Sequence, residues 1–162
     1  MKTSVLLADD HRIMRQGLRA LLDDNPDMEV VAEAGEGRTA LRLARELSPD
    51  VVVMDISMPD LNGIDAARMI TAEVPGVKII ALSVHSDKRF VVEMLRAGAS
   101  GYLLKDCALD ELVRAIRAVN ANQTYLSPEV VGTMIDEFIR ASSDADVSAF
   151  SILTPREREV LQ

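Results

Sequence analysis

Polar side chains stand at the ends of four short apolar runs in this sequence. They comprise three carboxylates, one hydroxyl and one amine, and they are Asp9, Asp10, Asp55, Ser83 and Lys105. Carboxylates that lie close together repel one another unless a cation is present. Mg2+ suits such a group, because this ion binds one or two carboxylates together with water and phosphate oxygens. These residue types therefore predict phosphoryl transfer at a magnesium site.

The chemistry gives each member of this group a separate task. The carboxylate of Asp55 can attack as a nucleophile, Lys105 offers a mobile positive charge to phosphate, and the hydroxyl of Ser83 offers one hydrogen bond. Taken singly, each residue has an ordinary structural explanation, such as a helix cap for Asp9 or Asp10 and a solvated charge for Lys105. Their joint placement at the ends of predicted strands favours the functional interpretation.

The elements that must position these residues follow a regular alternation. Apolar runs rich in Val, Ile and Leu predict five strands, at residues 4–8, 28–34, 50–54, 77–83 and 101–104. Stretches with apolar residues at helical spacing predict five helices, at residues 12–22, 39–47, 64–73, 89–97 and 109–121. We expect an α/β fold, a doubly wound, flavodoxin-like parallel sheet with strand order 2-1-3-4-5. Such sheets bind ligands at the carboxyl ends of their strands, where the five polar residues stand.

The pattern changes after residue 121. Ser127 and Pro128 predict the start of a sixth helix with one apolar stripe. The stripe comprises Val130, Val131, Met134, Ile135, Phe138 and Ile139. Residues 141–150 are small and polar, which is typical of a flexible linker, and residues 154–157 have the order of a capping box that opens a further helix. We therefore expect three parts, at residues 1–121, 122–150 and 151–162.

Composition excludes several classes of function. The formal net charge of −8 and an aromatic content of 3% argue against nucleic-acid binding by the bulk of the chain. The single cysteine, Cys107, excludes a disulfide framework and a zinc site built from several thiolates. No apolar run approaches the roughly 20 residues that span a bilayer, and the N-terminus lacks the pattern of a signal peptide. We expect a cytoplasmic protein without a membrane partner.

Four motifs carry a resemblance to a known family. They read LLADDHRIMRQGLRALL, VVVMDISMPDLNGIDA, IIALSVH and AGASGYLLKD, and they cover residues 1 to 121. The chain resembles the receiver domains of bacterial response regulators, and more narrowly the NarL/FixJ group that ends in a LuxR-type helix-turn-helix. The resemblance implies a CheY-like receiver domain at residues 1–121, a linker helix and flexible linker at 122–150, and the start of a DNA-binding domain at 151–162.

The resemblance also implies roles for particular residues. Asp55 would be the phosphoacceptor, and Asp10, Asp55 and the backbone carbonyl of Ser57 would bind Mg2+ with Asp9 close by, through a water molecule. Ser83 and Lys105 would hold the phosphoryl oxygens. The residues that carry these roles are Asp9, Asp10, Asp55, Ser57, Ser83 and Lys105. The loop after the phosphoacceptor also matches, at Met58, Pro59 and Gly63.

Tyr102 stands where receiver domains carry a switching aromatic ring. The resemblance implies that Ser83 moves toward the phosphate and vacates space that the ring then fills. The signal would pass to the face formed by the fourth helix, the fifth strand and the fifth helix. The alternative explanation of Tyr102 is a half-buried aromatic residue of a strand.

The family implies partners as well as a site. A sensor histidine kinase would donate the phosphoryl group, and phosphorylation would favour a homodimer that controls transcription. The tail ILTPREREVLQ resembles the first helix of a LuxR-type domain, and Arg156 and Arg158 could lie near DNA. The recognition helix is not among these residues, so we expect this chain alone to bind DNA poorly or not at all. We expect no enzyme activity beyond the phosphorylation and dephosphorylation of the chain itself.

Two other interpretations are weaker. A Mg2+-dependent hydrolase of the haloacid dehalogenase type would also use Asp55 as a nucleophile, but it needs a second Asp two residues later, where this chain has Ser57. A nucleotide-binding module would need a GxGxxG or GxxxxGK[ST] motif, and neither is present. His11 and His85 are interpreted as polar residues at the mouth of the site rather than as ligands.

Overall fold

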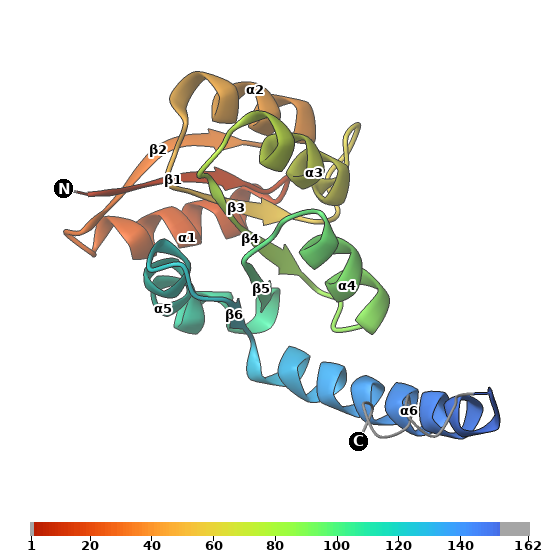
Figure 1. Cartoon of the computed structure of the whole chain (residues 1–162). Helices are drawn as coiled ribbons and strands as arrows, with labels where there is room; N and C mark the ends of the chain where they lie inside the picture. The colour runs from red at the N-terminus through yellow and green to blue at the C-terminus, as the bar shows by residue number, and fades with distance from the viewer. Residues whose placement is uncertain (1, 153–162) are drawn as a thin grey trace.

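Five strand-helix units form the body of the molecule, and a short strand and a long helix follow them (Figure 1). The computed structural model describes residues 2–152, with side chains described for residues 2–136 and 138–141. The elements in chain order are β1 (Thr3–Ala8), α1 (Arg12–Asp23), β2 (Met28–Ala34), α2 (Gly37–Leu47), β3 (Val51–Asp55), α3 (Gly63–Glu73), β4 (Lys78–Ser83), α4 (Lys88–Arg96), β5 (Gly101–Leu104), a 3-10 turn (Lys105–Cys107), α5 (Ala108–Asn120), β6 (Tyr125–Leu126) and α6 (Pro128–Ile152). The five predicted strands and five predicted helices are all present, with ends that shift by one or two residues.

The sheet is parallel throughout and has the order β2-β1-β3-β4-β5-β6. The predicted order 2-1-3-4-5 is therefore confirmed, and β6 extends it at one edge. Strands β1 and β3 are neighbours in register, with Ala8 opposite Met54. Since both strands run in the same direction, Asp9, which follows β1, and Asp55, which ends β3, meet at one end of the sheet. The doubly wound topology thus brings together acids that are 46 positions apart in sequence.

Helices cover both faces of the sheet (Figure 1). On one face, α1 and α5 pack on a cluster that includes Val51 and Val53; on the other, α2, α3 and α4 pack on a cluster that includes Val52 and Met54. All four of these β3 side chains are buried completely. This is why the strands read as continuous apolar runs, because alternate residues of a central parallel strand face two separate cores.

Strand β6 was not predicted. Tyr125 and Leu126 pair with Gly101 and Tyr102 of β5, and the Ser127 N–H then donates a hydrogen bond to the Tyr102 carbonyl oxygen at 3.0 Å. Two residues are too few to show a strand period, so the alternation in the sequence gave no sign of this pairing. The pairing anchors the start of α6 to the edge of the sheet.

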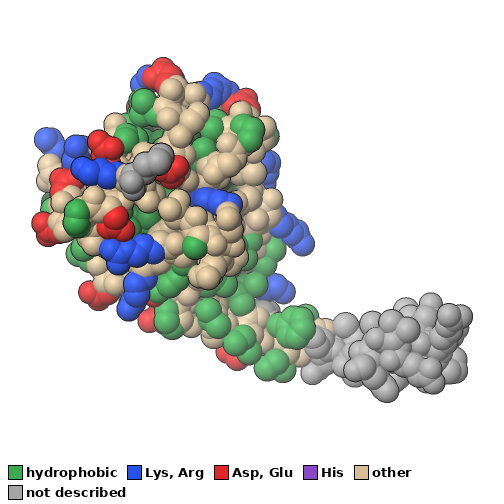
Figure 2. All heavy atoms as spheres, turned by 60° about the vertical axis from the view of Figure 1, so that its left-hand side comes forward, with side chains coloured by type: hydrophobic (Ala, Val, Ile, Leu, Met, Phe, Trp, Pro, Cys, Tyr) green, Lys and Arg blue, Asp and Glu red, His purple; other side chains and the backbone are tan. Residues whose placement is uncertain are grey.

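Helix α6 begins at Pro128, as predicted, but it runs on to Ile152, through the segment predicted to be a flexible linker. Residues 141–150 contain neither Gly nor Pro, so nothing in them interrupts a helix that has already begun. The first turn is anchored by the buried Val130, whereas apolar side chains farther along lie at the surface (Figure 2). They are Val131, Ile135, Phe138 and Ile139. The predicted start of a DNA-binding domain lies almost wholly outside the described residues.

No helix among residues 2–152 combines the length and the apolar character that crossing a bilayer requires.

Candidate functional site

The carboxyl ends of β1, β3 and β5 meet in a cluster of charged side chains. Asp9 and Asp55 are both buried, each with 1% of its surface exposed. The Lys105 ammonium, which follows β5, lies 3.1 Å from Asp55 Oδ2 and 3.3 Å from Asp9 Oδ2. Buried charges are stable only when they are paired, and this lysine serves two carboxylates at once. The predicted grouping of Asp9, Asp55 and Lys105 is present in the structure.

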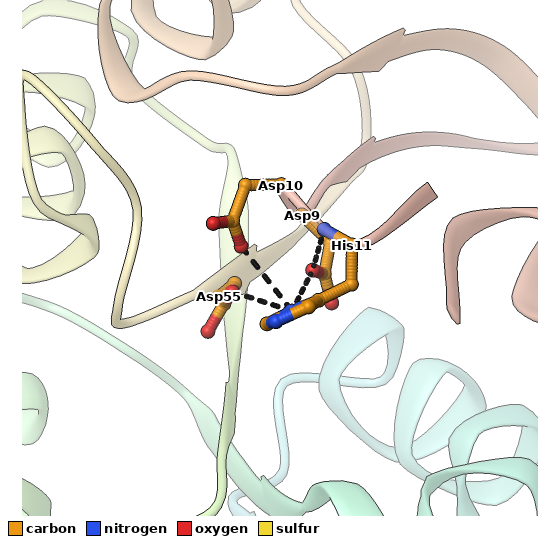
Figure 3. A group of neighbouring side chains, drawn as sticks. All are labelled: Asp9, Asp10, His11 and Asp55. Carbon is orange, nitrogen blue, oxygen red and sulfur yellow. Dashed lines mark hydrogen bonds and ion pairs between the residues drawn. The ribbon is translucent and has the colours of Figure 1, made fainter. Parts of the chain in front are cut away.

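Asp10 and His11 complete the cluster from the loop after β1 (Figure 3). The His11 Nδ1 atom lies 3.1 Å from Asp9 Oδ1, 3.2 Å from Asp10 Oδ1 and 3.8 Å from Asp55 Oδ2. One candidate ligand atom from each of these four residues lies within 4.8 Å of every other. The His11 side chain is 63% exposed, which agrees with its predicted place at the mouth of the site, and its ring nitrogen faces the carboxylates.

The charges of this cluster suit a divalent cation. Three carboxylates face one ammonium, so the cluster retains a surplus of negative charge. Asp9 Oδ2 is buried and accepts no hydrogen bond from the described residues, although the Lys105 ammonium lies nearby. A buried oxygen with lone pairs to spare is what a hard metal ion requires. The residues present therefore fit a cation such as Mg2+.

The loop after β3 folds tightly over Asp55. The Ser57 N–H donates a hydrogen bond to Asp55 Oδ1 at 3.1 Å, and the Gly63 N–H donates one to the Ile56 carbonyl oxygen at 2.9 Å. A Cβ atom at Gly63 would overlap the Asp55 backbone carbonyl, so only glycine allows this approach. The loop thereby fixes one Asp55 oxygen and leaves the other facing Lys105.

Ser83 ends β4 beside this loop. Its neighbour Leu82 is paired with Asp55, and the Leu82 carbonyl accepts a hydrogen bond from the Ile56 N–H at 3.1 Å. Ser83 is buried, with 2% of its surface exposed, and its Oγ accepts a hydrogen bond from the His85 N–H at 2.9 Å. Ser83 thus lies on the strand next to Asp55, at the same end of the sheet.

Tyr102 lies inside the molecule. Its ring is fully buried in the core on the α4 face, and its hydroxyl donates a hydrogen bond to the His85 carbonyl oxygen at 2.7 Å. Burial raises the pKa of Tyr102, the hydroxyl of Ser83 lowers it to a smaller extent, and the charge of Asp87 raises it further. Tyr102 therefore attaches the β4–α4 loop to β5. It does so at His85, the same residue whose N–H binds Ser83 Oγ.

A third buried acid, Glu111, was not predicted, and it links α5 to the segment between β5 and α6. Glu111 of α5 accepts hydrogen bonds from the Tyr125 hydroxyl at 2.8 Å and from Ser127 Oγ at 3.1 Å. The same Ser127 Oγ accepts a hydrogen bond from the Leu104 N–H at 3.2 Å. Leu104 directly precedes Lys105, so this network begins one residue from the charged cluster.

Comparisons with known proteins agree with this arrangement. A family described as the response regulator receiver domain matches residues 5–117. The transcriptional regulatory protein DegU of Brevibacillus brevis is 36% identical over 174 residues, which span 99% of this chain and 74% of DegU. The response regulator GacA of Pseudomonas protegens is 39% identical over 156 residues, which span 96% of this chain and 72% of GacA.

Solved structures with a similar fold are also response regulators. A two-component response regulator of the LuxR family from Aurantimonas sp. is similar with a TM-score of 0.82 and 37% identity, over 86% of this chain and 99% of that one. None of these similarities supports the alternative of a haloacid dehalogenase-like hydrolase. The chain therefore belongs to the response regulator receiver family, and its role in a two-component system is regulatory rather than catalytic.

Proposed function

We propose that Asp55 accepts a phosphoryl group from a sensor histidine kinase, with Mg2+ bound beside it. The observation that carries this proposal is the position of Asp55 Oδ2, 3.1 Å from the Lys105 ammonium at the carboxyl end of the sheet. Asp55 Oδ1 is held by the Ser57 N–H, so Oδ2, which faces the Lys105 ammonium, is the oxygen that would attack phosphorus. Its attack forms a bond from oxygen to phosphorus as the bond from phosphorus to the donor breaks.

The neighbouring residues position and neutralise the phosphoryl oxygens. Lys105 supplies a positive charge that can follow the transferred group, and Ser83 supplies a hydroxyl. Asp10, Asp55 and the Ser57 carbonyl would hold Mg2+, with Asp9 close by through a water molecule. When bound, the ion neutralises charge on the transferred phosphoryl oxygens.

Phosphorylation would act as a switch rather than as a step of turnover. A phosphoryl group on Asp55 attracts Ser83, whose Oγ is now engaged by the His85 N–H. Release of that hydrogen bond frees the loop that also holds the Tyr102 hydroxyl, and the change can pass to α4 and β5. A homodimer and control of transcription through a LuxR-type domain would follow. Because the kinase needs ATP and the output needs DNA, the chain would act in the cytoplasm.

Labelling with acetyl phosphate tests the proposal. The chain incubated with acetyl phosphate and Mg2+ should gain one phosphoryl group by intact mass, and the gain should disappear in Asp55→Asn or after chelation of the metal. Asp60→Asn is the matched control, because Asp60 lies in the same loop and pairs instead with Arg38. Incorporation that persists in Asp55→Asn would contradict the proposal.

A further inference from the structure

Helix α6 has two apolar faces, and the body of the molecule covers only one of them. Val130 is fully buried, and Met134 packs against the core cluster that contains Tyr102. Four other apolar side chains of the helix, between 38% and 72% exposed, form a second face about 100° away around the helix (Figure 2). We call it the outer face, and it consists of Val131, Ile135, Phe138 and Ile139. The described residues leave this face open to solvent.

The spacing on the outer face suits a short crossing with another helix. Val131, Ile135 and Ile139 are four residues apart and form one ridge, with Phe138 beside it. Such ridges pack into the grooves between the same ridges of a second helix, and the two helices then cross at about 50°. The ridge is about 12 Å long, and the next residue in the row is Ser143. This length fits two helices that cross and diverge, and not a long coiled coil.

No charge interrupts the outer face. The charged residues of α6 with described side chains, Glu129, Asp136 and Arg140, lie more than about 100° away from its centre around the helix. The formal net charge of −8 opposes the approach of two copies of the chain. Contact through the outer face is compatible with this charge, because it brings two uncharged surfaces together and buries no ionised group.

The course of α6 favours a second copy of the chain over the segment that follows the helix. Helix α6 continues to Ile152 and projects beyond the body of the molecule (Figure 1). A following segment therefore begins about 20 Å beyond Ile139, and the intervening helix holds it away from the outer face. A second copy carries the same ridge, and two identical surfaces can pair about a two-fold axis near Ile135.

We propose that the outer face of α6 is the contact surface of a symmetric dimer of this chain, and that the contact forms before phosphorylation. Four side chains cover much less than the roughly 800 Å² per partner of a standard interface. Association through this face alone is therefore weak and reversible. The inference rests on the proposed function only in that a homodimer is expected there, since the surface itself follows from the geometry of α6.

Sedimentation equilibrium of the whole chain without a phosphodonor tests the proposal. The wild type should show a reversible equilibrium of monomer and dimer at concentrations up to about 0.5 mM. Ile135→Glu should weaken the association about tenfold or more, because it places two like charges near the two-fold axis. Met69→Glu is the matched control, because Met69 is 43% exposed but lies on α3, and it should associate as the wild type does. A dimer that Ile135→Glu leaves intact overturns the inference.

Cross-linking identifies what covers the outer face. Cys107 is the one cysteine of the chain, so Cys107→Ser provides a background without thiols. In that background, Ile135→Cys should link two copies through a short bismaleimide, and Met69→Cys should not. A chain that stays monomeric at every concentration overturns the inference. Protection of Ile135→Cys from thiol reagents in that monomer would assign the face to the segment after α6 instead.

Acetyl phosphate labelling separates the two proposals. Ile135→Glu should gain one phosphoryl group as the wild type does, because Ile135 lies on α6 and not at the carboxyl ends of the strands. Labelling of Asp55 in a wild-type chain that stays monomeric contradicts only the α6 contact. A dimer through α6 in a chain that gains no phosphoryl group contradicts only the phosphoacceptor role.

Discussion

At the scale of single residues, Lys105 is the charge that makes the metal-free site stable. Its ammonium, 9% exposed, pairs with the buried carboxylates of Asp9 and Asp55. In the absence of metal, Lys105→Met should lower the free energy of unfolding by about 2 kcal/mol. This loss is smaller than that expected for breaking a fully buried ion pair, because the neighbouring Asp10 side chain is partly exposed and water can reach the site. Mg2+ should restore part of this loss, because the ion binds only the folded state. Urea denaturation with and without Mg2+ measures both effects.

Lys2→Met is the control for this experiment, because Lys2 is exposed and precedes β1, at the end of that strand opposite to the site. It removes the same charge and should leave the free energy of unfolding within about 0.5 kcal/mol of the wild type. A loss that is equal in the two variants would show that net charge, and not the pairing at the site, determines the stability.

The same scale shows what sequence reasoning can and cannot predict about a site. Asp9, Asp55 and Lys105 were predictable because a strand end fixes where the next residue must stand. The place of His11 at the mouth of the site agrees with its 63% exposure, but the direction of its ring was not predictable, since it depends on the contacts that the ring makes in the loop after β1. Glu111 was missed for a related reason. It looks like an ordinary polar residue of a helix, and its burial depends on β6 and Ser127, which reach it from beyond the sheet pattern.

At the scale of elements, an ion pair joins α1 to β2 and should give a measurable pH dependence. Burial raises the pKa of Glu33, but hydrogen bonds from Arg19 and Arg15 outweigh it and hold the pKa below its ordinary value of 4.5. A lowered pKa in the folded state means that the stabilisation is present above the ordinary value and is lost as the pH falls through the folded value. Glu33→Gln should therefore be less stable than the wild type near neutral pH, by about 0.5 kcal/mol. The difference should shrink in acid.

Denaturation at a series of pH values checks this. Glu29→Gln is the control, because Glu29 is an exposed glutamate of the same strand. Its difference from the wild type should not follow the trend of Glu33→Gln. A Glu33→Gln difference that stays constant into acid would mean that the arginines stabilise the strand without regard to the carboxylate charge.

The elements themselves were predictable wherever a period was long enough to read. The alternation of β3 between two cores and the helical spacing of α1 to α5 each arise from burial, which the sequence records directly. Strand β6 was missed because its pairing depends on the edge that β5 offers. The end of α6 was missed because small polar residues are compatible with both a linker and a continued helix.

At the scale of the whole molecule, the charged cluster and α6 are joined by a short buried path. Lys105 follows Leu104, the Leu104 N–H binds Ser127 Oγ, and Ser127 also bonds to Glu111. Ser127 is 1% exposed and directly precedes α6. Its hydroxyl does not cap the helix but holds it to the end of β5. A movement of Lys105 toward a phosphoryl group would therefore act on the base of α6.

Ser127→Ala tests whether this path joins the two regions. The substitution leaves the Leu104 N–H and a Glu111 oxygen without their partner inside the protein, which should cost about 1–2 kcal/mol. Hydrogen exchange should become faster at Leu104 and in the first turns of α6, while exchange in β1 and β3 stays slow. Thr133→Ala is the matched control, because the Thr133 hydroxyl bonds only to the Glu129 carbonyl within α6. If exchange rises in β5 but not in α6, the serine supports the strand alone and α6 must receive any signal from Tyr102 and α4 instead.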